Sequence, residues 1–204
     1  MTKVMLVRHG VTAWNNIGKM QGTSDVHLSP DGLHQARLLA AHCPFFTANA
    51  IYSSPLARAE TTALILANRF NLQVQTVQEF QETNFGDWEG QILRNIAKTD
   101  PINFEKFFMQ PDELKIPNAE TFAETQERAM SALKKILDAH RTEKDSQIII
   151  VAHGAINRVI LAKILEMPLK KMWSLSQFNT AINIFREDDG HFTVDLINST
   201  AHLA

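Results

Sequence analysis

The sequence predicts an α/β fold: a three-layer sandwich with a mainly parallel sheet, helices on both faces and a small helical insertion at about residues 91–118. Short apolar runs typical of strands alternate with longer segments of helical periodicity. Two of these runs, Val4–Val7 and Ile148–Val151, contain no polar residue, as expected of strands covered on both faces. No repeat, low-complexity segment or linker divides residues 1–204, so we expect a single domain.

The first half of the chain alternates between strands and helices. Ser29 followed by Pro30 is typical of a helix cap with proline in the first turn, and this helix should run to about Cys43. Pro55 opens a second helix. The strands expected around these helices are residues 4–7, 50–52 and 72–77.

The second half continues the alternation after the insertion. Thr121 and Glu124 fit a capping box, and the helix that follows should reach about His140. The remaining expected elements are a strand at 148–151, a helix at about 156–166, and strands at 178–186 and 191–197 joined by a turn. The phenylalanine-rich insertion either forms a core of its own or acts as a lid, and we favour an insertion with the site under its edge.

The composition excludes several classes of protein. The net charge of -2 lacks the basic excess of a nucleic-acid-binding protein. No stretch approaches the roughly 20 apolar residues of a membrane helix, and the apolar run before Arg8 is too short for a signal peptide. Cys43 is the only cysteine, so no intramolecular disulfide can form. We expect a cytoplasmic protein with no nucleic-acid or membrane partner, and a homodimer remains open.

Two of the apolar strands end in histidine and glycine. Arg8, His9 and Gly10 follow the first strand, and His153 and Gly154 follow the strand at 148–151. Ligands of open parallel sheets bind beyond the carboxyl ends of the strands, so both imidazoles should reach one edge. A glycine at such a position lets the backbone turn sharply and lets a ligand approach closely.

A second arginine follows the strand at 50–52. Arg58 lies near the start of a helix, where a positive charge is unfavourable unless an anion is close, although its side chain could also extend into water. The guanidinium fork matches phosphate oxygens, so Arg8 and Arg58 could clamp one anion. A catalytic site at this edge would also need an acid. The loop after the strand at 72–77 offers Glu79, Glu82, Asp87 and Glu89, and their spacing in the sequence does not identify which of them has this role.

Together these motifs resemble the histidine phosphatase superfamily, which has the phosphoglycerate mutase-like fold. The matching stretches occur in family order and cover nearly the whole chain: residues 8–10, 14–15, 21–29, 53–63, Glu82 with 85–90, and 152–154. The resemblance implies that His9 is the nucleophile that becomes phosphorylated and that Glu82 is the general acid and base. It also implies that Arg8, Arg58 and His153 are catalytic residues that hold the phosphoryl oxygens, with Asn15 as a further contact. The substrate-binding residues that it implies are Arg8, Asn15, Gln21, Gly22, Arg58, His153 and Gly154.

The resemblance implies no cofactor and no metal, because fixed side-chain cations supply the positive charge. The histidines show no metal-ligand spacing, and Cys43 lacks the arginine that a cysteine-dependent phosphatase requires. No nucleotide-binding glycine motif occurs either. A rim formed by Trp14, Phe85 and either Phe104 or Phe108 would accept an apolar leaving group.

The sequence at 85–90 resembles the small-phosphatase branch, which includes α-ribazole phosphatases and broad-specificity enzymes. The expected substrate is a small phosphomonoester such as α-ribazole 5'-phosphate or a sugar phosphate. The alternatives are a phosphoglycerate mutase, disfavoured because the segment Gln91–Pro117 lacks an arginine pair, and a non-catalytic phosphate-binding module. Ala119 replaces a family glycine beside Glu120, for which we favour a structural role.

Overall fold

The computed structural model describes residues 1–204 and contains one six-stranded sheet in the order β3-β2-β4-β1-β5-β6. The first four strands in this order are parallel, and β5 and β6 are antiparallel additions at one edge. The predicted mainly parallel sheet is therefore confirmed. The strands are β1 (Thr2–Arg8), β2 (Ala50–Ser53), β3 (Val74–Thr76), β4 (Ser146–Ala152), β5 (Ile182–Asp188) and β6 (His191–Ser199).

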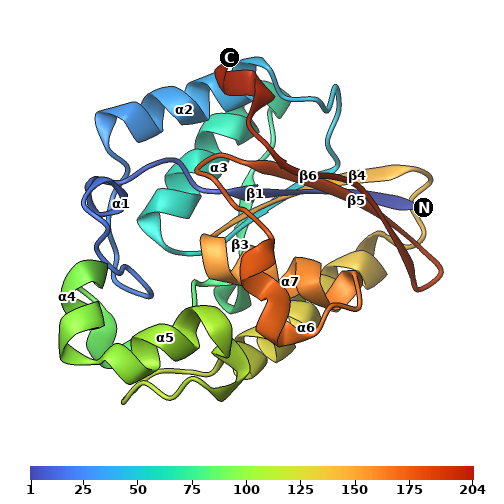
Figure 1. Cartoon of the computed structure of the whole chain (residues 1–204). Helices are drawn as coiled ribbons and strands as arrows, with labels where there is room; N and C mark the ends of the chain where they lie inside the picture. Colours follow the sequence, from blue (N-terminus) through green and yellow to red (C-terminus); the bar gives the residue numbers. More distant parts are fainter.

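Helices cover the sheet on both sides, as the sequence predicts. Figure 1 shows α2 (Pro30–Ala41) and α3 (Ala57–Phe70) on one face and α6 (Phe122–His140) and α7 (Gly154–Ile164) on the other. The short helix α1 (Ala13–Asn16) follows β1. None of the helices has the length and apolar content needed to cross a membrane.

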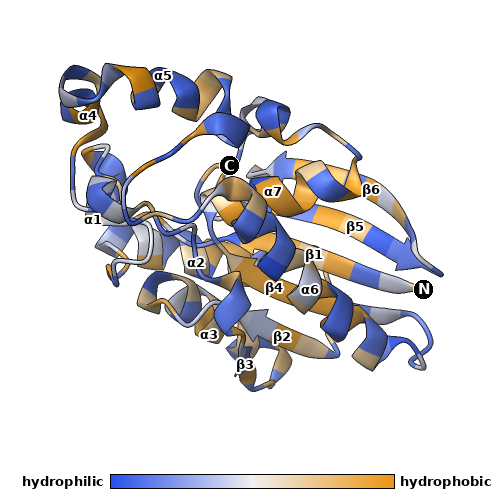
Figure 2. Cartoon of the chain, turned by 90° about the horizontal axis from the view of Figure 1, so that it is seen from below, coloured by the Kyte–Doolittle hydropathy of each residue, from blue (hydrophilic) through white to orange (hydrophobic).

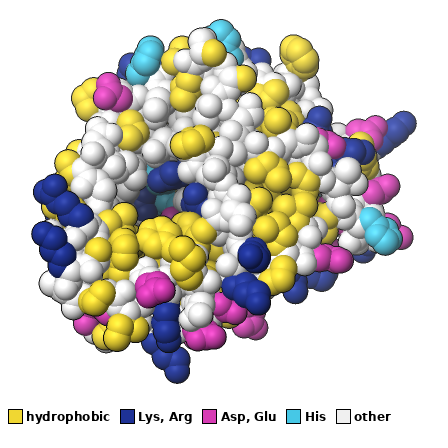
Figure 3. All heavy atoms as spheres, viewed as in Figure 1, with side chains coloured by type: hydrophobic (Ala, Val, Ile, Leu, Met, Phe, Trp, Pro, Cys, Tyr) yellow, Lys and Arg dark blue, Asp and Glu magenta, His cyan; other side chains and the backbone are white.

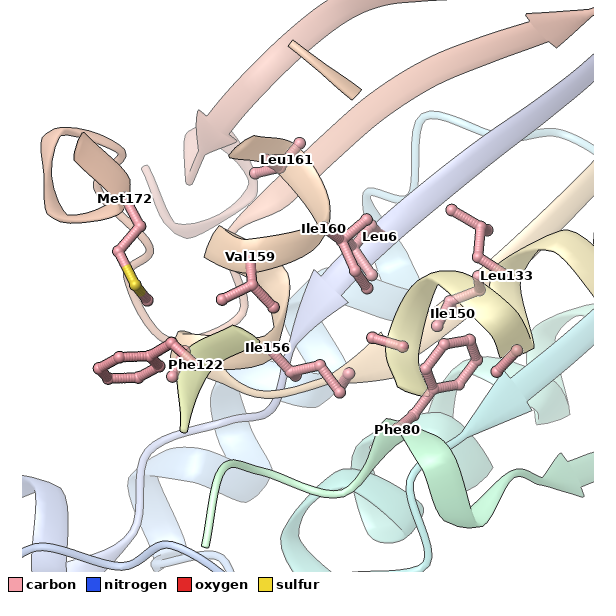
Figure 4. Packing of buried hydrophobic residues seen from close by; sticks show 14 of the residues in the cluster. Leu6, Phe80, Phe122, Leu133, Ile150, Ile156, Val159, Ile160, Leu161 and Met172 are labelled. Carbon is pink, nitrogen blue, oxygen red and sulfur yellow. The ribbon is translucent and has the colours of Figure 1, made fainter. Parts of the chain in front are cut away.

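The central strands are buried on both faces because successive side chains point to opposite sides. In β1, Leu6 packs into the cluster formed with α6 and α7, whereas Met5 packs into the cluster formed with α2 and α3. Figure 2 shows the resulting apolar colour along the central strands. Figure 4 shows Leu6 and Ile150 packed beside Leu133 of α6 and Ile160 of α7. This packing fixes the ends of β1 and β4, where the site residues follow.

The predicted helix caps form. Ser29 Oγ accepts a hydrogen bond from Gly32 N at 3.1 Å, and Thr121 and Glu124 make both bonds of the capping box. Several boundaries differ from the prediction: β3 is shorter, α3 begins two residues after Pro55, and α7 begins at Gly154 instead of 156. The strand expected from residue 178 begins only at Ile182, because Thr180 adopts a left-handed backbone (φ 56°).

The insertion forms α4 (Leu93–Thr99), α5 (Pro101–Met109) and a 3-10 turn at Pro111–Glu113. It has no separate core, because Ile96 and Phe107 belong to the cluster of α6 and α7. The Phe107 ring lies 4.6 Å from the Trp173 ring, centroid to centroid, which ties α5 to the segment after α7. Leu93, Phe107 and Phe108 also line the pocket described next, so the site lies under the edge of the insertion.

Candidate active site

One pocket gathers most of the residues that the sequence singled out. Figure 3 shows a hollow with Lys or Arg and His atoms at its floor and hydrophobic side chains along its border. It lies beyond the carboxyl ends of β1 and β4. The expected residues that line it are Arg8, His9, Asn15, Gln21, Gly22, Arg58, Glu82 and Gly154. Among the expected aromatic rim residues, Phe85 and Phe108 line the pocket and Trp14 and Phe104 do not.

His9 is a neutral, oriented imidazole. Its Nδ1 lies 2.7 Å from the carbonyl oxygen of Gly10, so the ring proton is on Nδ1 and Nε2 is left unprotonated. Burial lowers the pKa of His9 well below its usual value, and the charges of Arg58 and Arg8 lower it further. An unprotonated ring nitrogen beside two guanidinium groups is suited to attack an anionic phosphorus.

Arg58 is fully buried and held by acceptors from three directions. Its Nη2 donates to Gly22 O at 2.6 Å, its Nη1 to Ser24 O at 2.8 Å and its Nε to Nδ1 of His153 at 3.2 Å. Burial lowers the pKa of Arg58 to about 10, so it remains charged at neutral pH. Arg58 is thus a fixed positive charge at the pocket wall.

Glu89 holds the loop that anchors Arg58. Its carboxylate accepts hydrogen bonds from the backbone N–H groups of Thr23 at 2.7 Å and Ser24 at 3.0 Å, and from both hydroxyl groups. Gly22 has a left-handed backbone (φ 52°), and a Cβ there would clash with the Glu89 carboxylate. The sequence offered Glu89 only as a competing acid, whereas the structure makes it a support for Arg58.

His153 lies behind the pocket rather than on its lining. Its ring centroid is 5.1 Å from that of His9. Because Nδ1 accepts from Arg58, the ring proton is on Nε2, which lies 2.7 Å from Ser54 Oγ. Burial, followed by the charge of Arg58, lowers the pKa of His153 well below its usual value. A phosphoryl oxygen would have to replace Ser54 as the partner of Nε2.

Glu82 is the carboxyl group that faces the pocket. It accepts hydrogen bonds from the backbone N–H groups of Ala155 at 3.0 Å and Ile156 at 3.1 Å, at the first turn of α7, and from Thr83 N at 3.0 Å. The other candidate acids have partners away from the pocket. Glu79 forms an ion pair with Lys135, Asp87 accepts a hydrogen bond from Asn118, and Glu89 accepts hydrogen bonds from the loop at 23–24. Geometry therefore separates acids that spacing did not.

Glu120 supports the loop of Glu82 from outside the pocket. Its carboxylate accepts a hydrogen bond from Asn84 N at 2.8 Å and forms an ion pair with Arg128. The Arg128 guanidinium also donates to the carbonyl oxygen of Glu82 at 3.2 Å. The left-handed residue of this turn is Asn118 (φ 61°) and not Ala119, so alanine fits where the family has glycine.

Two arginines meet at the start of α7. Arg8 donates from Nη1 to Gln177 O at 2.6 Å, and its buried Nε has no protein partner. Arg158, which sequence reasoning missed, lines the same pocket and lies over the Trp173 ring with Cζ 4.9 Å from the centroid. Its position four residues after Gly154 on the same helix face was the available signal. Lys19 is a further missed cation of the lining.

The segment 175–181 forms hydrogen bonds that position Arg8, His9 and Arg158. The carbonyl oxygen of Leu175 accepts from Arg158 Nε at 2.7 Å, just as Gln177 O accepts from Arg8. The carbonyl oxygen of His9 accepts from Asn179 Nδ2 at 3.1 Å and from Thr180 N at 3.2 Å. A left-handed backbone is strained for a β-branched residue, so the fold maintains Thr180 in this state at a cost.

The described residues contain no group of three or more histidine, cysteine, aspartate or glutamate side chains that could hold a metal ion. The charged groups that face the pocket are side-chain cations and Glu82. An anion entering this pocket would therefore meet guanidinium and ammonium groups directly.

Comparison with known proteins agrees with this geometry. The model of the histidine phosphatase superfamily (branch 1) matches residues 4–200. Phosphoserine phosphatase 1 of Hydrogenobacter thermophilus is 29% identical over 203 residues, which cover 100% of this chain and 95% of that protein. The metal-independent phosphoserine phosphatase of Arabidopsis thaliana is 31% identical over 211 residues, which cover 100% and 84%.

A solved structure gives the same result. A mutant phosphoserine phosphatase from Entamoeba histolytica, in complex with phosphoserine, has a TM-score of 0.87 to this chain at 32% identity, with 100% of both chains covered. The fold, the paired strand-histidine-glycine motifs and the family match lead to one conclusion. The chain belongs to branch 1 of the histidine phosphatase superfamily and is a phosphatase.

Proposed function

We propose that this phosphatase hydrolyses small phosphomonoesters through a phosphohistidine on His9 and without a metal ion. The observation that carries the proposal is the neutral His9 ring, whose unprotonated Nε2 lies in a pocket with Arg8 and Arg58. In the first step a bond forms between Nε2 and phosphorus, and the bond from phosphorus to the leaving oxygen breaks. In the second step water attacks the phosphohistidine and releases inorganic phosphate.

Glu82 carries the proton in both steps. The leaving oxygen takes a proton from the Glu82 carboxyl group, and the carboxylate then takes a proton from the attacking water. Its place on the pocket lining supports this role over the other three acids. The three backbone N–H groups that bind the carboxylate stabilise it after it has given up the proton.

The cations hold the transferring phosphoryl group, whose negative charge persists through the transition state. The unpartnered Nε of Arg8 is a free donor for one phosphoryl oxygen. Asn15 uses its side-chain oxygen to accept from Thr12 N at 3.0 Å, which leaves its NH2 group for the pocket. Arg58 contributes mainly fixed charge, because each of its nitrogens already donates to the protein.

The first substrate to examine is phosphoserine, since relatives that align with the whole chain bear that name. We keep α-ribazole 5'-phosphate and sugar phosphates from the sequence prediction. Hydrolysis is favoured over mutase activity because the insertion contributes apolar groups to the pocket and no arginine. We place the enzyme in the cytoplasm, where its buried free Cys43 would stay reduced, and the homodimer remains a prediction.

The test is phosphate release from a panel of phosphomonoesters with and without EDTA, beside isomerisation of 3-phosphoglycerate primed with its bisphosphate. We expect turnover that EDTA leaves intact and that the His9→Ala variant loses. Loss of activity in EDTA that returns with a divalent metal would contradict the metal-free mechanism. Isomerisation faster than every hydrolysis would contradict the hydrolytic assignment.

A further inference from the structure

Arg158 is a rigid cation that the phosphohistidine mechanism does not use. Its Nε donates to Leu175 O at 2.7 Å and its Nη1 to Gly154 O at 2.9 Å, while its Cζ lies over the Trp173 ring at 4.9 Å from the centroid. Its Nη2 makes no hydrogen bond within the protein, and no carboxylate forms an ion pair with it. The guanidinium is therefore fixed on three sides and free on the fourth, within the pocket lining.

Arg158 and Arg8 approach each other over Gly154. A Cβ on this glycine would lie 3.2 Å from Nη1 of Arg158 and 3.4 Å from Nε of Arg8. Two guanidinium groups this close repel each other, and the charge of Arg8 contributes, after burial, to lowering the pKa of Arg158 to about 10. Neighbouring cations are stabilised when an anionic ligand binds between them.

The pocket carries more positive charge than a phosphate group alone would neutralise. Its lining holds four cations, Arg8, Lys19, Arg58 and Arg158, against the single carboxylate of Glu82. A phosphate dianion offsets two of these positive charges when Glu82 holds the proton for the leaving oxygen, and together with the ionised Glu82 it offsets three. At least one cation stays without a partner unless the substrate brings a second anionic group.

We propose that Arg158 binds a carboxylate of the substrate, next to the phosphoryl group held by Arg8. This inference rests on the proposed function and narrows it to small phosphomonoesters that carry a carboxylate a few bonds from phosphorus. A guanidinium N–H suits a carboxylate oxygen, and the two carbonyl oxygens and the Trp173 ring hold this guanidinium in place. The apolar wall of Phe107, Phe108 and Leu93 then faces the remaining carbon skeleton.

The experiment compares substrate pairs that differ only in the carboxylate region. The pairs are O-phosphoserine with O-phosphoethanolamine, and 3-phosphoglycerate with glycerol phosphate. We expect the wild-type enzyme to favour the carboxylate-bearing member of each pair in kcat/KM by about tenfold or more, as for a charged hydrogen bond. Arg158→Met should remove most of that preference, because kcat/KM should fall more for the carboxylate-bearing member of each pair than for the member without a carboxylate.

Three variants serve as controls. Arg158→Lys keeps the charge without the fork and should retain part of the preference. Arg141→Met removes an exposed arginine that pairs with Asp189 at 3.1 Å, away from the pocket, and should leave the preference unchanged. His9→Ala should be inactive on all four substrates, which tests the proposed function separately.

A wild-type enzyme that turns over both members of each pair equally would overturn the inference, whatever the variants do. An equal loss on both members in Arg158→Met would also overturn it, because Arg158 would then act on the phosphate or on the fold. If Arg158→Met does not fold, the wild-type ratio and the Arg158→Lys ratio decide the question.

Discussion

Arg58 donates a hydrogen bond of 3.2 Å from Nε to Nδ1 of His153, and this contact determines where the second histidine carries its proton. The ring is neutral, with the proton on Nε2 directed to Ser54. The charge of Arg58 then opposes any second proton on the ring. His9 lies under the same influence, because its pKa is lowered by burial and then by Arg58 and Arg8.

Both buried histidines should therefore stay neutral in mildly acidic solution. In ¹⁵N-histidine spectra recorded from pH 8 to pH 6, the signals of His9 and His153 should remain at neutral positions. The variants His9→Ala and His153→Asn assign the two signals. Titration of either ring near pH 6.5, the ordinary histidine value, would contradict the buried cationic environment described for the pocket.

The same pKa directions predict a loss of stability in mild acid. The folded-state pKa values of His9, His153 and His202 are lowered, so below about pH 6.5 the unfolded chain binds more protons than the folded one. Their contribution to stability is complete above that pH and is lost as the pH falls. The free energy of unfolding should fall by about 1 kcal/mol or more between pH 7 and pH 5.5.

Urea unfolding at these pH values measures the effect. The carboxylates with lowered pKa values, such as Glu143 and Asp195, weaken the fold only at lower pH, near their unfolded values. His153→Asn should flatten the dependence between pH 7 and 5.5. Constant stability across this window would show that the histidines are protonated as easily in the folded chain as in the unfolded one.

The loss of turnover in Glu82→Gln should depend on the leaving group of the substrate. Alkyl phosphates need a proton on the leaving oxygen, so their turnover should fall by about 100-fold or more. An aryl phosphate such as p-nitrophenyl phosphate needs little protonation and should be nearly spared. Glu89→Gln loosens the loop that holds Arg58 and should slow both classes alike. An equal loss on both classes in Glu82→Gln would remove the acid role.

Asn179→Ala should lower kcat more than it raises KM. The change removes the 3.1 Å hydrogen bond to the carbonyl oxygen of His9, so the nucleophile would be less well oriented. We expect a loss of about tenfold in kcat and about 1 kcal/mol of stability. The exposed Asn95→Ala is the matched control. Unchanged kcat with reduced thermal stability would make Asn179 a purely structural residue.

Local signals in the sequence predicted the central strands and the starts of two helices. Uninterrupted apolar runs predicted β1 and β4, because a strand covered on both faces has no solvent-facing position for a polar residue. Ser29 and Thr121 marked helix starts, because their side chains bind backbone N–H groups that the helix itself leaves free.

The remaining features depend on contacts between distant segments. No local sequence signal distinguishes Glu82 from Glu89. The two carboxylates differ in their hydrogen-bond partners, which are at the start of α7 for Glu82 and in the loop at 23–24 for Glu89. Arg158 looks like any helical arginine until Trp173 and Leu175 fold over it. The aromatic and β-branched residues near Thr180 favour a strand by propensity, and tertiary hydrogen bonds to His9 override that preference.

The most direct test of the account is the identity of the phosphorylated residue. The enzyme is mixed with a labelled phosphomonoester, quenched within milliseconds in alkali, where phosphohistidine is stable, and digested for mass spectrometry. We predict that the label is on His9, is lost in acid, and disappears when fresh unlabelled substrate is added before the quench. Label on any other residue, or wild-type turnover by His9→Ala, would contradict the central claim.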